Sequence, residues 1–139
     1  MTRFNPTLIA AIAGALLIGS GMAVAGDSKV SLTGADEVPA VTTSATGAGT
    51  ISVKDDKSVS GKVTTKGIVG TVAHVHLGAP GKNGPPVITL TKTSEDVWSV
   101  PEGSKLTDEQ YASYKAGDLY VNVHSAEHKG GEIRAQLKP

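Results

Sequence analysis

The chain of 139 residues contains no cysteine, and aromatic residues make up only 4% of it. Without cysteine it can form no disulfide, and any soft-metal site must use histidine or methionine instead of thiolate. Basic and acidic side chains balance at 13 each, which argues against binding to nucleic acid or to an anionic membrane surface. These absences exclude disulfide scaffolds and thiol catalysis. The domain must instead be stabilised by its packed core.

A hydrophobic run long enough to cross a membrane is also lacking at the amino terminus. Arg3 is the only charged residue among the first 25, an uncharged run extends from 8 to 18, and Ala23-Val24-Ala25 closes the segment. A basic start, a short apolar run and a small-x-small site are typical of a secretory signal peptide, whereas a membrane helix needs ~20 apolar residues. A retained anchor is the less favoured alternative.

We therefore predict a signal peptide at 1–25, one domain at 26–139, and a periplasmic or secreted location. Removal of Arg3 leaves 12 basic against 13 acidic residues, a net charge of −1. A nearly neutral domain has no electrostatic attraction to nucleic acid or to membranes after signal cleavage.

Abundant glycine, valine and threonine favour strands over helices. Short runs of alternating apolar and polar residues are separated by turn residues, and Asp55-Asp56 connects two of them as a hairpin. Seven or eight such runs predict an all-β, antiparallel sandwich or barrel. The expected strands are 29–33, 49–53, 58–65, 71–77, 87–90, 97–100, 119–124 and 132–137.

One segment, 106–117, departs from the strand pattern and predicts a short helix. Thr107 is a suitable N-cap, Asp108 and Glu109 occupy the first turn, and Gly117 ends the segment. We expect a crossover between strands and not a second domain.

All four histidines fall in two short motifs, His74-Val75-His76 and His124-x-x-x-His128. Because side chains alternate along a strand, His74 and His76 project from one face, and His124 lies on a strand whose other face is apolar. If the two strands are close, three imidazoles converge on a rigid backbone. Neutral imidazole is a good ligand for copper and zinc, so we predict a metal site at His74, His76 and His124. Solvated surface histidines are the alternative.

His128 is a candidate fourth ligand, although it lies in a polar turn where an exposed histidine is common. Tyr120 and Asn122 share the face of His124 and are candidates to line the site or to support its ligands. Arg134 is a candidate to guide an anion to the metal, and a surface ion pair with Glu132 or another acidic residue is the alternative. The Gly- and Pro-rich loop 77–86 is expected to form a rigid wall beside the histidines.

Five motifs follow one another in order along 30–137. They are Leu32-Thr33-Gly34-Ala35-Asp36-Glu37-Val38-Pro39, Ala73-His74-Val75-His76-Leu77-Gly78, Gly81-Lys82-Asn83-Gly84-Pro85, Ala116-Gly117-Asp118-Leu119-Tyr120-Val121-Asn122-Val123-His124 and Gly130-Gly131-Glu132-Ile133-Arg134. Together they resemble the CHRD domain family, which is named for repeats in chordin and occurs alone in exported bacterial proteins. The resemblance implies a single domain spanning nearly all of the chain after the signal.

A more distant resemblance is to Cu/Zn superoxide dismutases. His74-Val75-His76 is similar to their His-Val-His copper strand, Val123-His124 to their late copper ligand, and Arg134 to their substrate-guiding arginine. The resemblance implies a Greek-key β-sandwich with copper at the three histidines. The chain lacks a bridging histidine, a zinc-loop cluster and a cysteine pair, so the resemblance implies copper more than zinc.

Three functions remain open at this point. The leading hypothesis is a periplasmic copper-binding protein for storage, delivery or tolerance, which exchanges metal with a copper-handling protein. The second is a copper-only enzyme similar to superoxide dismutase, and the third is a metal-free interaction module. Catalysis is therefore undecided from the sequence, and tight copper binding separates the third hypothesis from the first two.

Overall fold

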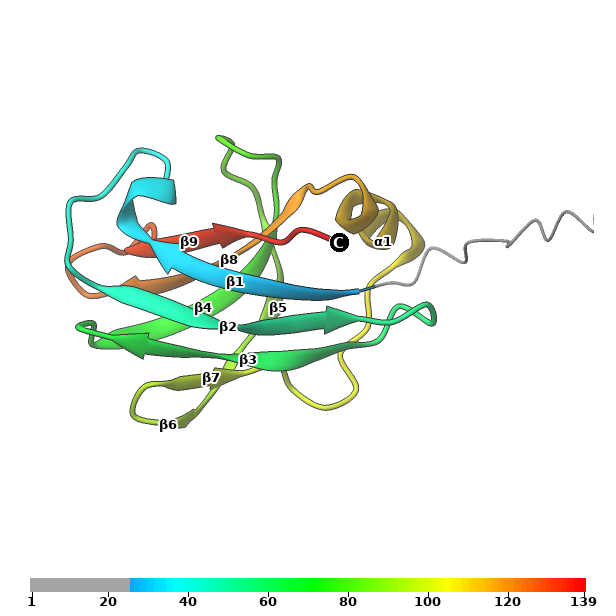
Figure 1. Ribbon diagram of the computed structural model, residues 1–139, viewed down its shortest axis with the longest axis horizontal. Coiled ribbons are helices and arrows are strands. Elements are labelled where there is room, and N and C mark those ends of the chain that lie inside the picture. Colours follow the sequence, from blue (N-terminus) through cyan, green and yellow to red (C-terminus); the bar gives the residue numbers. More distant parts are fainter. Residues whose placement is uncertain (1–25) are drawn as a thin grey trace, which may run out of the picture.

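The computed structural model describes residues 26–139, which form one β-barrel with a single α-helix (Figure 1). The predicted signal peptide at 1–25 lies outside the described residues. In chain order the elements are β1 (Asp27–Thr33), the 3₁₀ turn η1 (Gly34–Asp36), β2 (Thr46–Val53), β3 (Val59–Lys66), β4 (Gly70–Leu77), β5 (Pro86–Thr89), β6 (Thr91–Ser94), β7 (Val97–Ser99), α1 (Asp108–Lys115), β8 (Leu119–Ser125) and β9 (Ile133–Gln136).

The nine strands form one antiparallel sheet in the order β5-β4-β8-β9-β1-β2-β3-β7-β6. Its two outermost strands, β5 and β6, are joined in the chain by Leu90 alone. The sheet therefore has to curl until its two ends meet, which makes a nearly closed barrel and leaves little open edge. The pairs β4–β8, β9–β1 and β3–β7 join strands that are distant in the chain, so the predicted antiparallel, Greek-key-like barrel or sandwich is confirmed.

The barrel interior is filled by the apolar half of each alternating strand. On β8, Leu119, Val121 and Val123 are fully buried in this core, against Ala73 and Val75 of β4. The opposite face of β8 is buried too, because every residue of this strand is buried. Loops cover that second face, and the polar side chains on it are the predicted site residues.

The predicted helix is confirmed, with Asp108–Lys115 in regular α conformation. Thr107 accepts a hydrogen bond from the backbone of Gln110, whose side chain accepts one from Thr107 N in return, which is a capping box. Gly117 follows the helix with a φ of +83°, a conformation that glycine adopts without strain. As Figure 1 shows, the helix closes the end of the barrel where the chain also ends.

Two elements were not predicted from the sequence. Strand β6 (Thr91–Ser94) is exposed at every position and so has no apolar alternation. The short turn η1 follows β1 directly and brings Glu37 into the protein. No helix in the 26–139 region is both long and apolar enough to span a membrane.

Candidate metal centre

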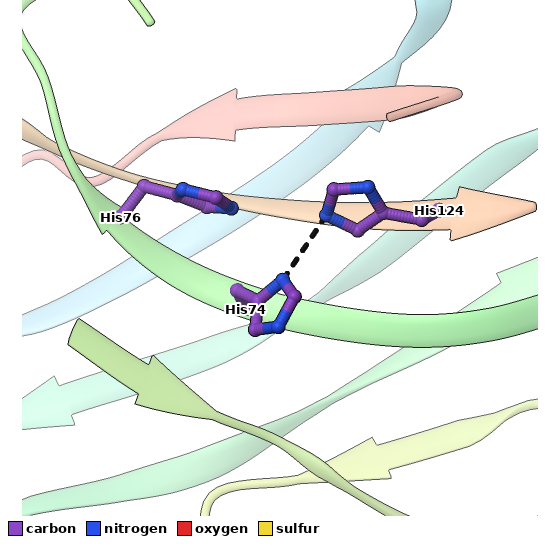
Figure 2. A group of neighbouring side chains, drawn as sticks. All are labelled: His74, His76 and His124. Atoms are coloured by element: carbon purple, nitrogen blue, oxygen red, sulfur yellow. Dashed lines mark hydrogen bonds between the residues drawn. The ribbon is translucent and has the colours of Figure 1, made fainter. Parts of the chain in front are cut away.

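The two histidine motifs lie on neighbouring strands, β4 and β8. In the antiparallel register His74 faces Asn122, while His124 faces Val72 two residues away along β4. His74, His76 and His124 therefore meet on the same face, and Figure 2 shows their rings gathered above the two strands. The prediction that three imidazoles converge on adjacent strands is confirmed.

The rings are close enough to share an ion. One ring nitrogen from each histidine lies within 4.8 Å of the other two. Two nitrogens bound to one ion at 2.0–2.1 Å are at most about 4.2 Å apart, so a ring shift of less than about 1 Å brings all three into range. The cluster is thus compatible with metal binding.

In two of the three rings, a backbone carbonyl determines which nitrogen is free to bind a metal. His76 Nδ1 lies 2.9 Å from Gly84 O, and His124 Nδ1 lies 2.8 Å from Lys129 O. A carbonyl oxygen can only accept, so each Nδ1 carries the hydrogen and donates it. In the neutral rings the lone pair is therefore on Nε2, the arrangement that protein metal sites use to orient imidazole ligands.

In the third ring, His74 Nδ1 lies 3.1 Å from His124 Nε2. The dashed line in Figure 2 marks this contact. Because His124 Nε2 holds a lone pair, His74 Nδ1–H is the donor in this contact. For both nitrogens to bind one ion, this proton must move from Nδ1 to Nε2 of the same ring. His74 is partly exposed, so solvent can carry the proton between its two nitrogens.

Burial favours the neutral form of two of the rings. It lowers the pKa of His74, and the neighbouring His124 and His76 lower it further. It also lowers the pKa of His76, against the opposing effect of the Gly84 carbonyl. The Asn122 amide also favours the charged His76 ring, although no hydrogen bond of acceptable geometry joins the two side chains. Neutral rings are the form that binds a metal.

His76 is also part of a stack of planar groups. Its ring is parallel to that of Tyr120, with centroids 4.7 Å apart, and the Arg134 guanidinium lies 3.4 Å from the Tyr120 centroid. Arg134 donates to Lys82 O at 2.7 Å and to Asn83 Oδ1 at 3.2 Å. The stack and these bonds hold the 78–85 loop, including Gly84 O, against the site.

Arg134 does not reach solvent, since only 1% of it is exposed. The role of guiding an anion needs an exposed guanidinium, so this placement gives that role no support. The alternative ion pair with Glu132 is not formed within the described region either, because the Glu132 carboxylate accepts from Thr43 and Ser125 hydroxyls instead.

Asn122 lies between Tyr120 and His124 on β8 and is 1% exposed. Its amide donates to Glu37 Oε1 at 3.3 Å. Burial raises the pKa of Glu37, while the Asn122 hydrogen bond and the Arg134 charge oppose this. Glu37 was not predicted as a site residue, because it belongs to a turn 85 positions away in the chain. Its place in the first of the five motifs was the one available signal.

His128 is not part of the three-histidine group among the described residues. It lies in the β8–β9 turn, where its backbone N–H donates to Ser125 Oγ and its carbonyl accepts from Gly131 N. The structure thus brings together His74, His76 and His124, places Tyr120 and Asn122 beside them, and assigns His128 a place in the turn.

Comparison with known proteins identifies the family. The CHRD domain model matches residues 28–137, almost the whole described region, so the chain belongs to the CHRD domain family. No curated protein and no solved structure matches the chain. The resemblance to dismutases therefore rests on the short histidine motifs and Arg134 alone.

Proposed function

We propose that this member of the CHRD domain family is an exported copper-binding protein that holds one copper ion with His74, His76 and His124. Its role would be the storage, delivery or tolerance of copper in the periplasm or outside the cell. The bound copper would be held by imidazole ligands and would remain exchangeable.

The observation that carries the proposal is the state of His76 Nε2. It is one of three buried side-chain nitrogen or oxygen atoms in the described residues that have no hydrogen-bond partner. A buried polar atom without a partner is costly, and natural proteins retain one where a ligand or ion completes it. Its lone pair belongs to the same cluster as those of His74 and His124, which supports an ion as the missing partner.

Copper is favoured over other metals by the kind of donors present. The chain has no thiolate, and three imidazoles suit copper and zinc better than magnesium or calcium. Among divalent ions of the first transition row, copper binds such donors most tightly. Zinc is the second choice.

Binding is proposed in place of catalysis. A dismutase attracts its anionic substrate by an accessible positive charge, and Arg134 is buried against Tyr120 and the 78–85 loop. The partial exposure of His74 instead supports metal exchange at that side of the cluster, with a copper-handling protein as the proposed partner.

Titration with Cu²⁺ tests the proposal. His76→Ala should weaken binding roughly 100-fold or more, because a rigid three-ligand site loses one donor. His128→Ala is the matched control, since it removes a histidine outside the cluster, and should change affinity by less than about threefold. A wild-type protein without a tight copper site would contradict the proposal and favour a metal-free interaction module.

A further inference from the structure

A second buried atom at the site is also without a partner, the Asn122 side-chain oxygen Oδ1. Asn122 lies directly opposite His74 in the β4–β8 register, and its side chain adjoins the His76 ring. With 1% of the residue exposed, water from the bulk cannot reach Oδ1 freely. The two orphaned atoms, His76 Nε2 and Asn122 Oδ1, therefore belong to the same buried face.

The orientation of the Asn122 amide follows from its other contacts. Nδ2 lies 3.3 Å from Glu37 Oε1 and 3.5 Å from Gly130 O. Gly130 O can only accept, and an ionised Glu37 carboxylate also only accepts, so the NH₂ group must face both. The oxygen is consequently turned away from Glu37 and toward the histidines.

The space for this arrangement depends on Gly131. A Cβ at this position would collide with both Asn122 Nδ2 and Glu37 Oε1, and the residue has a φ of +123°. The Gly130-Gly131 turn thus lets Glu37 approach Asn122 and hold its amide. No bulkier residue would permit the same contact without movement of the turn.

Two acceptors on this face are without a donor. His76 Nδ1 donates its hydrogen to Gly84 O, so Nε2 presents a lone pair, and Asn122 Oδ1 presents another. A cation is the partner that satisfies both atoms, because nitrogen and amide oxygen are both donors to divalent transition metals.

We infer that Asn122 Oδ1 is a fourth metal ligand, which completes a three-nitrogen, one-oxygen donor set, and that Glu37 is its positioning residue. This inference rests on the proposed metal site. An oxygen donor with a buried carboxylate behind it favours a divalent ion, Cu²⁺ or Zn²⁺, over monovalent copper, which prefers softer donors.

Copper(II) loading of three proteins tests the inference: wild type, Asn122→Leu and Asn122→Asp. Leucine has nearly the same size but no donor, so we expect about 10- to 100-fold weaker Cu²⁺ binding and an altered electron paramagnetic resonance spectrum. Aspartate keeps an oxygen at the same place, and a proton held between its second oxygen and Glu37 replaces the amide donor, so affinity should return to within about tenfold of wild type. Circular dichroism establishes that each variant is folded.

Glu37→Leu provides a second test that leaves the ligand itself in place. Without its acceptor the Asn122 amide is free to rotate, so affinity should fall by a smaller factor and the copper spectrum should become heterogeneous. Glu95→Leu is the matched control: it makes the same substitution at an exposed glutamate in the turn between β6 and β7, on strands that carry none of the proposed ligands. Its copper spectrum should equal that of wild type.

The outcomes separate the two proposals. If wild-type protein binds no copper, the proposed function fails. If wild type binds copper and folded Asn122→Leu gives the same spectrum, whatever its affinity, the oxygen is not a ligand and this inference is overturned while the histidine site stands. An altered spectrum in Asn122→Leu that Asn122→Asp restores supports it.

Discussion

At the scale of single residues, the three histidines differ in what surrounds them. His76 and His124 each donate Nδ1–H to a backbone carbonyl, so their Nε2 lone pairs are directed to the cluster. His74 lacks such a carbonyl bond among the described contacts and instead donates to His124. Two ligands are thus already oriented for metal binding. His74 is the one whose ring proton must move from Nδ1 to Nε2 before its Nδ1 can bind an ion.

Metal affinity should depend on pH through these rings. Protonation competes with metal binding, and the pKa values of His74 and His76 are lowered, first of all by burial. The competition therefore begins at lower pH than for free imidazole, whose pKa is about 6.5. We expect copper affinity to be nearly constant from about pH 8 to 7 and to fall as pH decreases toward about 5.

Isothermal titration at a series of pH values measures this dependence. Below the pKa values of His74 and His76, these two rings by themselves should lower the affinity by up to about 100-fold per pH unit, because each must lose one proton before it binds. Constant affinity between about pH 7 and 5 would indicate carboxylate or backbone ligands instead of imidazole.

At the scale of elements, the segment between β4 and β5 is a fixed wall of the site. Lys82 O and Asn83 Oδ1 accept from Arg134, while Gly84 accepts from the His76 ring and donates to the Tyr120 hydroxyl. The predicted rigidity of this loop thus has a cause that its glycine and proline content alone did not reveal. A buried arginine from the last strand anchors it.

Arg134→Ala should loosen this wall. The change removes a stack on Tyr120 and leaves loop acceptors without a donor, so we expect a loss of about 2–4 kcal/mol in the free energy of unfolding. Urea denaturation measures the loss, and copper titration should show weaker binding because Gly84 O no longer fixes His76. Lys82→Ala is the control, since Lys82 contributes its backbone carbonyl to the Arg134 contact. A stability equal to wild type in Arg134→Ala would contradict the anchoring role.

At the scale of the whole molecule, the site is built from segments that are far apart in the chain. Glu37 follows β1, His74 and His76 lie on β4, and Asn122 and His124 lie on β8. These segments are together only in the folded state, so an ion bound by all of them stabilises the fold relative to the unfolded chain.

Copper should therefore raise the thermal midpoint of the wild-type domain. At a free copper concentration 100 times the dissociation constant, the stabilisation is about 2.7 kcal/mol, which corresponds to a rise of about 10 °C or more in a domain of this size. Scanning calorimetry with and without a chelator measures it. In His76→Ala the shift should be largely lost, and an equal shift in both proteins would show that copper binds elsewhere.

Much of the fold follows from local sequence. The alternation in 71–77 and 119–124 predicted both histidine strands and their apolar faces, because strand side chains alternate whatever the strand pairs with. Thr107 and Gly117 predicted the ends of the helix, since capping depends on residues within one turn. The His-x-His spacing alone placed His74 and His76 on one face.

The tertiary structure decided what depends on the partners of each residue. Register between β4 and β8, set by packing and turns far from the histidines, brought His124 beside His74. The chain reversal at η1 placed Glu37 against Asn122, and the 78–85 loop covered Arg134, whose polar sequence context suggested exposure. Backbone carbonyls of Gly84 and Lys129 fixed the ring nitrogens. Every residue has a backbone carbonyl, so the residue type does not reveal which carbonyl orients a histidine ring. Only the position of that carbonyl in the folded protein does.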